Sequence, residues 1–199
     1  MNQKADTPER VAERRQLDHT LERIEANLEE LEARLAAYAE DIQAQKEYLW
    51  TSRDEMDHIE KISARESIEQ AVMTGDNALA RRHKLEKLRH SPYFGRFDFA
   101  RGGKAEPVYI GIHHFHDDLA GVSRVHDWRA PIASLFYDYE TGPATYESPE
   151  GPVAGEISLK RQFRIKGGEI ELMIDSAVHV VDDVLQEELS RASDEGMKN

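Results

Sequence analysis

Apolar residues recur along the first part of the chain with alternating spacings of four and three. The row consists of Leu17, Leu21, Ile24, Leu28, Leu31, Leu35, Tyr38 and Ile42, and Leu49, Met56 and Ile59 keep its phase. A row that repeats every seven residues predicts a long helix that packs against another helix as a coiled coil. Its start is expected at Thr7-Pro8-Glu9, where a capping hydroxyl, a proline and an acid follow one another.

A second apolar row predicts a partner helix from about residue 59 to residue 88. Its members are Ile62, Ile68, Val72, Leu79, Leu85 and Leu88. The chain could reverse at residues 51–57 or at residues 74–77, and the second segment has the better turn chemistry. We favour the first, because it gives arms of comparable length, and Gly75 is then a helix-interior residue that costs about 1 kcal/mol. The alternative to this one-chain hairpin is that two chains pair through the first row.

After Ser91-Pro92, which ends the helical part, the pattern changes to aromatic residues and glycine. Residues 94–99 and 108–115 are predicted strands around a loop at 101–104, and residues 122–128 are a third strand. Residues 182–192 are a predicted short helix, and residues 193–199 a frayed end. The expected fold class is therefore α+β, with a coiled-coil hairpin at residues 8–90 and a small β-rich module at residues 91–192.

The clearest predicted β-hairpin turns at Gly167-Gly168. Its first strand places Ile157, Leu159, Phe163 and Ile165 on one face by simple alternation. The expected cross-strand pairs are Ile165 with Ile170, Phe163 with Leu172, Arg164 with Glu171 and Lys160 with Asp175. Arg161 interrupts the apolar face, so it is expected to find an acid or a carbonyl oxygen.

Composition limits the kinds of function. The chain has 199 residues and a formal net charge of -13, which argues against gripping a phosphate backbone by itself. It has no cysteine, so disulfides and thiolate metal sites are excluded. No apolar run approaches the roughly 20 residues of a membrane helix, and the first residues lack the apolar core of a secretory signal. We therefore expect no membrane association and a cytoplasmic location.

Two groups of charged residues are candidates for a structural or binding role. Asp127, Trp128, Arg129 and Asp138 are predicted structural anchors, with Arg129 buried and paired to Asp127 or Asp138. Near the predicted hairpin turn, Trp50 adjoins the acids Asp54, Glu55 and Asp57. These four residues are either a solvated helix face or a partner-binding tip.

Histidines gather in His113-His114 and His116, before Asp117-Asp118, with His126 nearby. The run resembles a set of metal ligands, but a polar strand end that enters an acidic turn is the favoured interpretation. We therefore predict no metal site. The chain has no nucleophile motif and no G-x-x-x-x-G-K-[ST] phosphate loop, so no catalytic or cofactor-binding residue is predicted.

Four segments carry a resemblance to a known family. Residues 91–99, 109–112, 127–140 and 155–163 occur in this order in the HelD proteins, the DNA helicase IV-like bacterial helicases related to UvrD and Rep. The chain resembles the N-terminal region of such a protein, with the β-rich module at the start of helicase domain 1A. The resemblance implies that ATP and magnesium, and any nucleic acid, are bound by the rest of the parent protein.

The resemblance also implies a partner. HelD-type proteins insert an N-terminal helical hairpin into the secondary channel of bacterial RNA polymerase, where acids at the tip can approach the catalytic magnesium. The expected function is polymerase binding within an ATP-dependent factor that releases nucleic acid from RNA polymerase and recycles it, and the chain alone should be monomeric. The alternatives are a bracing region of a DNA-unwinding repair helicase and a coiled-coil adaptor or dimerisation module without a motor.

Overall fold

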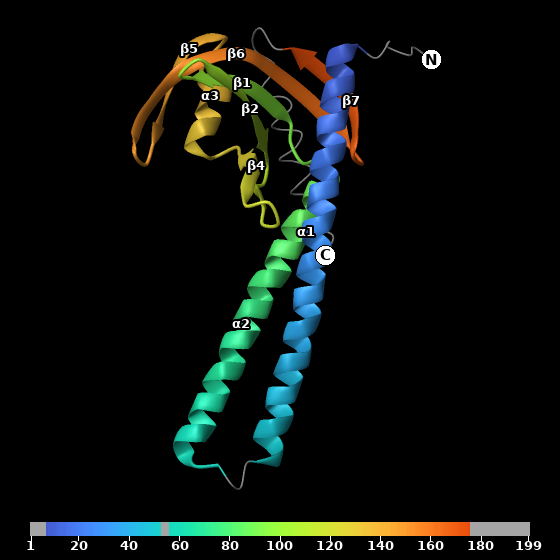
Figure 1. The fold of residues 1–199 in the computed structure, drawn as a ribbon, viewed down its shortest axis with the longest axis vertical. Coiled ribbons are helices and arrows are strands. Elements are labelled where there is room, and N and C mark those ends of the chain that lie inside the picture. The colour runs from blue at the N-terminus through green and yellow to red at the C-terminus, as the bar shows by residue number, and fades with distance from the viewer. Residues whose placement is uncertain (1–6, 53–55, 176–199) are drawn as a thin grey trace. The chain divides into compact units, whose positions relative to one another are not determined.

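Two long helices precede a mixed β-sheet in the computed structural model, which describes residues 7–52 and 56–175 (Figure 1). The helices are α1 (Pro8–Thr51) and α2 (His58–Leu88). The strands are β1 (Gly95–Arg101), β2 (Lys104–Gly111), β3 (Phe115–Asp117), β4 (Val122–Asp127), β5 (Gly142–Ser148), β6 (Gly151–Lys166) and β7 (Glu169–Asp175). Two short helices, η1 (Pro131–Ala133) and α3 (Ser134–Asp138), lie between β4 and β5. This order confirms the predicted α+β class.

The chain divides into two compact units. Of the described residues, 7–24 and 87–175 form the first, here called the sheet unit, and those between residues 25 and 86 form the second, here called the hairpin unit. Helix α1 contributes to both, which differs from the predicted division at residue 90. The reason is that the beginning of α1 buries Glu13 and Leu17 within the sheet unit.

Seven strands form the described sheet, in the order β3-β4-β2-β1-β6-β5, with β7 also pairing with β6. The neighbours are antiparallel except for β2 and β4, which are parallel. An aromatic core lies where α3 packs on the sheet (Figure 1). Its buried members are Phe94, Phe97, Phe99, Ile110, Ala133, Leu135, Phe136, Ala144 and Ile157. Helix α3 is short, and its two buried residues, Leu135 and Phe136, join this core.

Strand β6 carries a bulge that changes which residues share a face. Asp98 pairs with Leu159 and Phe99 with Ile157, so Ser158 is the extra residue. Paired residues lie on the same face, and Ile157 therefore joins the core with Phe99, whereas Phe163 lies on the opposite face with Arg161. The prediction that Ile157 and Phe163 share a face is wrong, because simple alternation does not account for the bulge.

The turn between β6 and β7 is confirmed at Gly167 and Gly168, whose φ angles are 57° and 78°. The predicted pair of Ile165 with Ile170 is also confirmed. The other predicted pairs are wrong: the structure pairs Arg164 with Leu172, Phe163 with Met173 and Arg161 with Asp175. An extra residue on β7, Glu171, shifts the register by one after the pair of Ile165 with Ile170.

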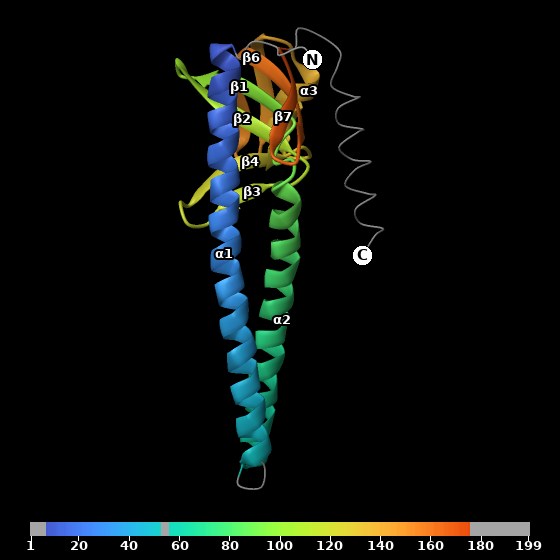
Figure 2. The same cartoon turned by 90° about the vertical axis from the view of Figure 1, so that its right-hand side faces the viewer.

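The hairpin unit reverses between Thr51 and His58, which confirms the first of the two predicted positions and places Gly75 inside α2. The view in Figure 2 shows the two helices of this unit running along one another. The inward row of α1 in this unit is the predicted one: Leu28 and Leu31 are buried, and Leu35, Tyr38, Ile42, Gln45 and Leu49 are partly buried. We call the two inward rows the seam.

The seam of α2 differs from the prediction. Its inward residues are Lys61, Ala64, Ile68, Ala71, Gly75, Ala78, Arg82 and Leu85. Three residues of the predicted row are largely exposed instead, namely Ile62 (43%), Val72 (40%) and Leu79 (42%). Small side chains occupy the middle of the seam, so a search for large apolar residues assigns the wrong face. No helix within the described residues is long and apolar enough to span a membrane.

Candidate protein-interaction site

Helix α2 begins with a reciprocal cap. The backbone N–H of Asp57 donates to Glu60 Oε2 at 2.9 Å, and the N–H of Glu60 donates to Asp57 Oδ1 at 2.8 Å. The pair satisfies two backbone N–H groups at the end of the hairpin. The predicted tip residue Asp57 therefore has a structural role, which the sequence signal D-x-x-E at residues 57–60 could have revealed.

Large hydrophobic residues are exposed close to the reversal of the hairpin. Trp50 is 75% exposed, Tyr48 is 61% exposed and Ile59 is 76% exposed. Asp54 and Glu55, the other two predicted tip residues, lie outside the described residues. A concentration of exposed apolar surface is typical of a protein-interaction site.

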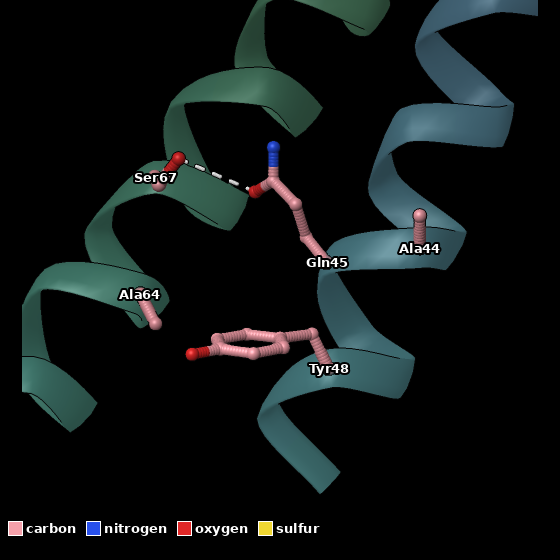
Figure 3. Close-up of a pocket in the computed structure, with 5 residues that line it drawn as sticks. All are labelled: Ala44, Gln45, Tyr48, Ala64 and Ser67. Carbon is pink, nitrogen blue, oxygen red and sulfur yellow. Dashed lines mark hydrogen bonds between the residues drawn. The ribbon is translucent and has the colours of Figure 1, made fainter. Parts of the chain in front are cut away.

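A shallow opening lies between the two helices beside Tyr48 (Figure 3). It has a volume of about 350 Å³, and its lining residues are Ala44, Gln45, Tyr48, Ala64 and Ser67. The Tyr48 ring extends across the gap toward Ala64, and the Ser67 hydroxyl donates to Gln45 Oε1 at 3.2 Å. Small side chains leave this space unfilled, so the hairpin presents a hollow as well as exposed rings.

The sheet unit fixes the beginning of α1 through a buried carboxylate. Glu13 is fully buried and accepts bonds from Arg96 Nη1 at 2.6 Å, Arg161 Nη1 at 2.8 Å and the Tyr109 hydroxyl at 3.2 Å. Burial and the Glu13 charge raise the pKa of Tyr109. Arg161 also donates to Asp175, which confirms the prediction that it finds an acid.

A second buried carboxylate joins α1 to β3 and β4. Asp117 is fully buried and accepts bonds from Arg23 Nε at 2.8 Å and Arg124 Nε at 2.7 Å. Neither buried acid was identified from the sequence, because each lies among many surface charges. Both sites are stabilising only as complete sets, since a buried charge without its partner is unfavourable.

Of the four predicted anchors, Arg129 and Asp138 are exposed, and Asp127 and Trp128 are partly buried. Arg129 donates to both oxygens of Asp127 at 2.8 Å, but its side chain is 69% exposed. The hydrogen bonds from Arg129 lower the pKa of Asp127. Asp138 is also exposed, at the end of α3, and Trp128 is partly buried against the core. The prediction that Arg129 is buried is wrong, because the turn after β4 presents it to solvent.

The histidines contact a serine. Ser123 Oγ lies 3.4 Å from His114 Nε2 and 3.3 Å from His116 Nδ1. Burial, together with the nearby His114, lowers the pKa of His126. Within residues 7–52 and 56–175, no three histidine, aspartate or glutamate side chains are placed to hold a metal ion.

The family model for the DNA helicase IV HelD N-terminal domain matches residues 10–192, which is most of the chain. The chain belongs to the HelD N-terminal domain family. It is thus a helicase-associated N-terminal region. A search of curated proteins gives no match. Within this HelD region, exposed apolar residues gather at the hairpin, whereas the arginines of the sheet unit described above are held by acids.

Proposed function

We propose that this HelD N-terminal region binds bacterial RNA polymerase through its hairpin unit. It would act within an ATP-dependent factor that releases nucleic acid from the polymerase and recycles it, with ATP and magnesium bound by other parts of the parent. The observation that carries the proposal is the exposure of Tyr48, Trp50 and Ile59 at the hairpin reversal. Aromatic residues of this kind commonly supply most of the binding energy of protein interfaces.

The distribution of charge supports a protein partner over nucleic acid. Arg96 and Arg161 are paired with Glu13, and Arg23 and Arg124 are paired with Asp117. Residues 25–86 contain 15 acidic and 8 basic residues, a net charge of −7. A surface of this sign repels a phosphate backbone but aids encounter with a basic protein surface, and that contribution weakens as salt rises.

The test is a binding titration of the chain against purified bacterial RNA polymerase. The double variant Tyr48→Ala/Trp50→Ala should raise Kd at least tenfold, because an interface loses its aromatic anchors. The matched control is Leu119→Ala/Val122→Ala, which removes two similarly exposed apolar residues of the sheet unit (49% and 46%) and should leave Kd within twofold. Full binding by a variant that lacks residues 26–85 would refute the proposal.

Two measurements separate the proposal from its alternatives. Light scattering should give a mass near 22.8 kDa, that of one chain, because the seam pairs α1 with α2 of the same chain. A stable dimer that dissociates on Leu28→Asp would support the adaptor function instead. A phosphate-release assay should detect no ATP turnover, because the chain lacks the phosphate loop on which ATP hydrolysis depends.

A further inference from the structure

The seam divides the surface of the hairpin unit into two flanking faces. One set of seam residues recurs every seven positions along each helix. On α1 this set is Leu28, Leu35, Ile42 and Leu49, and on α2 it is Lys61, Ile68, Gly75 and Arg82. In an antiparallel pair of helices, the residues one and four positions after each member of this set lie on one side of the seam. The residues one position before and two positions after each member lie on the other side. The opening in Figure 3 agrees with this assignment. Its lining residues Ala44, Tyr48 and Ser67 lie one position before or two positions after a member of the set, so all three are on the same side of the seam.

The face that contains the opening is uncharged over much of α2. Its α2 members include Ser63, Ser67, Gln70, Thr74 and Asn77. None of these five residues is apolar, and the exposed Tyr48 beside the opening is on the α1 side of this face.

The opposite face is apolar, and we call it the apolar face. It contains Ile62, Val72 and Leu79 of α2 and Trp50 of α1, each at least 40% exposed. The exposed Ala36 and Ala39 of α1 have the same spacings from the seam. The large side chains of Trp50, Ile62, Val72 and Leu79 are distributed along the helix axes, so the apolar face is elongated along the hairpin.

We propose that the apolar face docks an amphipathic helix of the partner, with lysine or arginine residues flanking its apolar side. This inference rests on the proposed function and adds the face and the chemistry of the contact. Val72 and Leu79 are seven residues apart, which is the spacing that a third helix meets when it packs along a coiled coil. The small side chains of Ala36 and Ala39 let that helix approach closely.

The acidic charge of the hairpin unit favours a docked helix with basic flanking residues and disfavours pairing with a second copy of the chain. Two hairpin units each carry a net charge of −7, so their faces repel one another. The apolar face itself bears Glu32, Glu69 and Asp76 along its length, and Lys46 and Arg65 are its basic members. A helix with basic flanks complements the acids while its apolar side covers Val72 and Leu79.

The experiment compares two double variants of the full chain, with purified bacterial RNA polymerase as the probe. Val72→Ser/Leu79→Ser removes two of the large side chains of the apolar face, and Met73→Ser/Ala80→Ser introduces two serines one position further along α2, where both residues are exposed. We expect at least a tenfold rise in Kd for the first variant and less than threefold for the second. Circular dichroism melts must show equal helix content for both.

A second measurement maps the contact. A photo-crosslinking amino acid replaces Gln43 on the apolar face or, as a matched control, Gln70 on the face that contains the opening. Both residues are exposed glutamines. Crosslinking to polymerase should come at least fivefold more from position 43. Mass spectrometry of the product should identify a helical polymerase segment with lysine or arginine beside its apolar residues.

The outcomes distinguish this inference from the proposed function. If the unaltered chain does not bind polymerase, both are refuted. If it binds and the two double variants bind alike, only the apolar face is refuted, and equal crosslinking from positions 43 and 70 has the same meaning. Crosslinks from position 43 to a second copy, or to another segment of the same chain, would assign the face to that occupant and overturn the proposed partner.

Discussion

The two units of this HelD N-terminal region differ in the kinds of side chains that they bury. The sheet unit encloses an aromatic core and two fully buried carboxylates, Glu13 and Asp117, each with two arginine partners. The hairpin unit has one seam, and most of its residues from Leu35 onward are only partly buried. Stability therefore concentrates in the sheet unit, and the hairpin unit is the part in which local opening costs least.

This difference teaches which part is suited to contact a partner. Buried charges with several partners demand one arrangement of the chain, because each lost partner leaves an unfavourable charge. A narrow seam places few demands on the residues around it, so exposed apolar residues such as Trp50 and Val72 are compatible with the hairpin fold. We expect substitutions to affect folding in the sheet unit and binding in the hairpin unit.

The largest effect is expected from Glu13→Ala. The substitution leaves Arg96 and Arg161 without their shared buried acceptor, although Asp98 and Asp175 still pair with them. We expect a loss of about 3 kcal/mol in the free energy of unfolding, measured by urea denaturation. Glu9→Ala, an exposed glutamate of the same helix, is the control and should change it by less than about 0.5 kcal/mol. Equal effects of the two substitutions would show that the buried carboxylate stabilises the sheet unit no more than a surface acid does.

A core substitution in the hairpin unit should act locally. Leu31 is 8% exposed, and Leu31→Ala should cost about 2 kcal/mol because it removes buried methyl groups from the seam. Hydrogen exchange should accelerate at amides of residues 25–86, while amides of β1 and β6 keep their protection. Equal acceleration in both units would show that they unfold together.

The same substitution should have opposite signs in the two units. In Gly95→Ala the new Cβ would lie 2.7 Å from the Phe136 ring, and we expect a loss of about 1–2 kcal/mol from overpacking. In Gly75→Ala the Cβ meets nothing within 4 Å, and removing a glycine from α2 should gain about 1 kcal/mol. Thermal melts would check both, and a destabilised Gly75→Ala variant would contradict the open space at that position.

The ion pair between Asp175 and Arg161 in the sheet unit should persist to a lower pH than the ordinary pKa of an aspartate would allow. The hydrogen bonds from Arg161 hold the pKa of Asp175 below its ordinary value of 3.8. A carboxyl group with a depressed folded-state pKa stabilises the fold above the unfolded pKa, and this contribution is lost as pH falls through the folded pKa. An NMR titration of the Asp175 carboxyl carbon should thus have its midpoint below 3.8, and Arg161→Gln should raise it.

The smallest effect is expected from Arg129→Ala. Its pair with Asp127 is exposed, and exposed ion pairs contribute about 0–1 kcal/mol. The melting temperature should shift by a few degrees at most. A large drop would show that the segment after β4 supports the core more than its exposure indicates.

Much of the fold follows from residue patterns, and the exceptions have physical causes. The uninterrupted four-and-three spacing predicts α1, and Gly167-Gly168 predicts the turn between β6 and β7. The seam of α2 is not predictable from apolar size, because Ala64, Ala71 and Ala78 occupy it. The bulges in β6 and β7 leave no clear mark in the sequence, since the extra residues Ser158 and Glu171 resemble ordinary outward positions.

The candidate site was predicted in part. The exposed Trp50 belongs to the predicted tip, and the sequence places it there by position alone. The apolar face was missed, because Ile62, Val72 and Leu79 were assigned to the seam. Faces of a hairpin become distinguishable only when the inward rows of both helices are known, and that requires the pairing itself.

The bulge at Ser158 also constrains how the sequence can change in evolution. Substitutions alter one side chain, but loss of a single residue there would reverse the alternation on one side of that point. Lys160 and Ile157 share the core face only because the extra residue separates them by an odd number of positions. Relatives that keep this sheet should therefore keep the spacing between the residues equivalent to Ile157 and Arg161, even where neither residue type is retained.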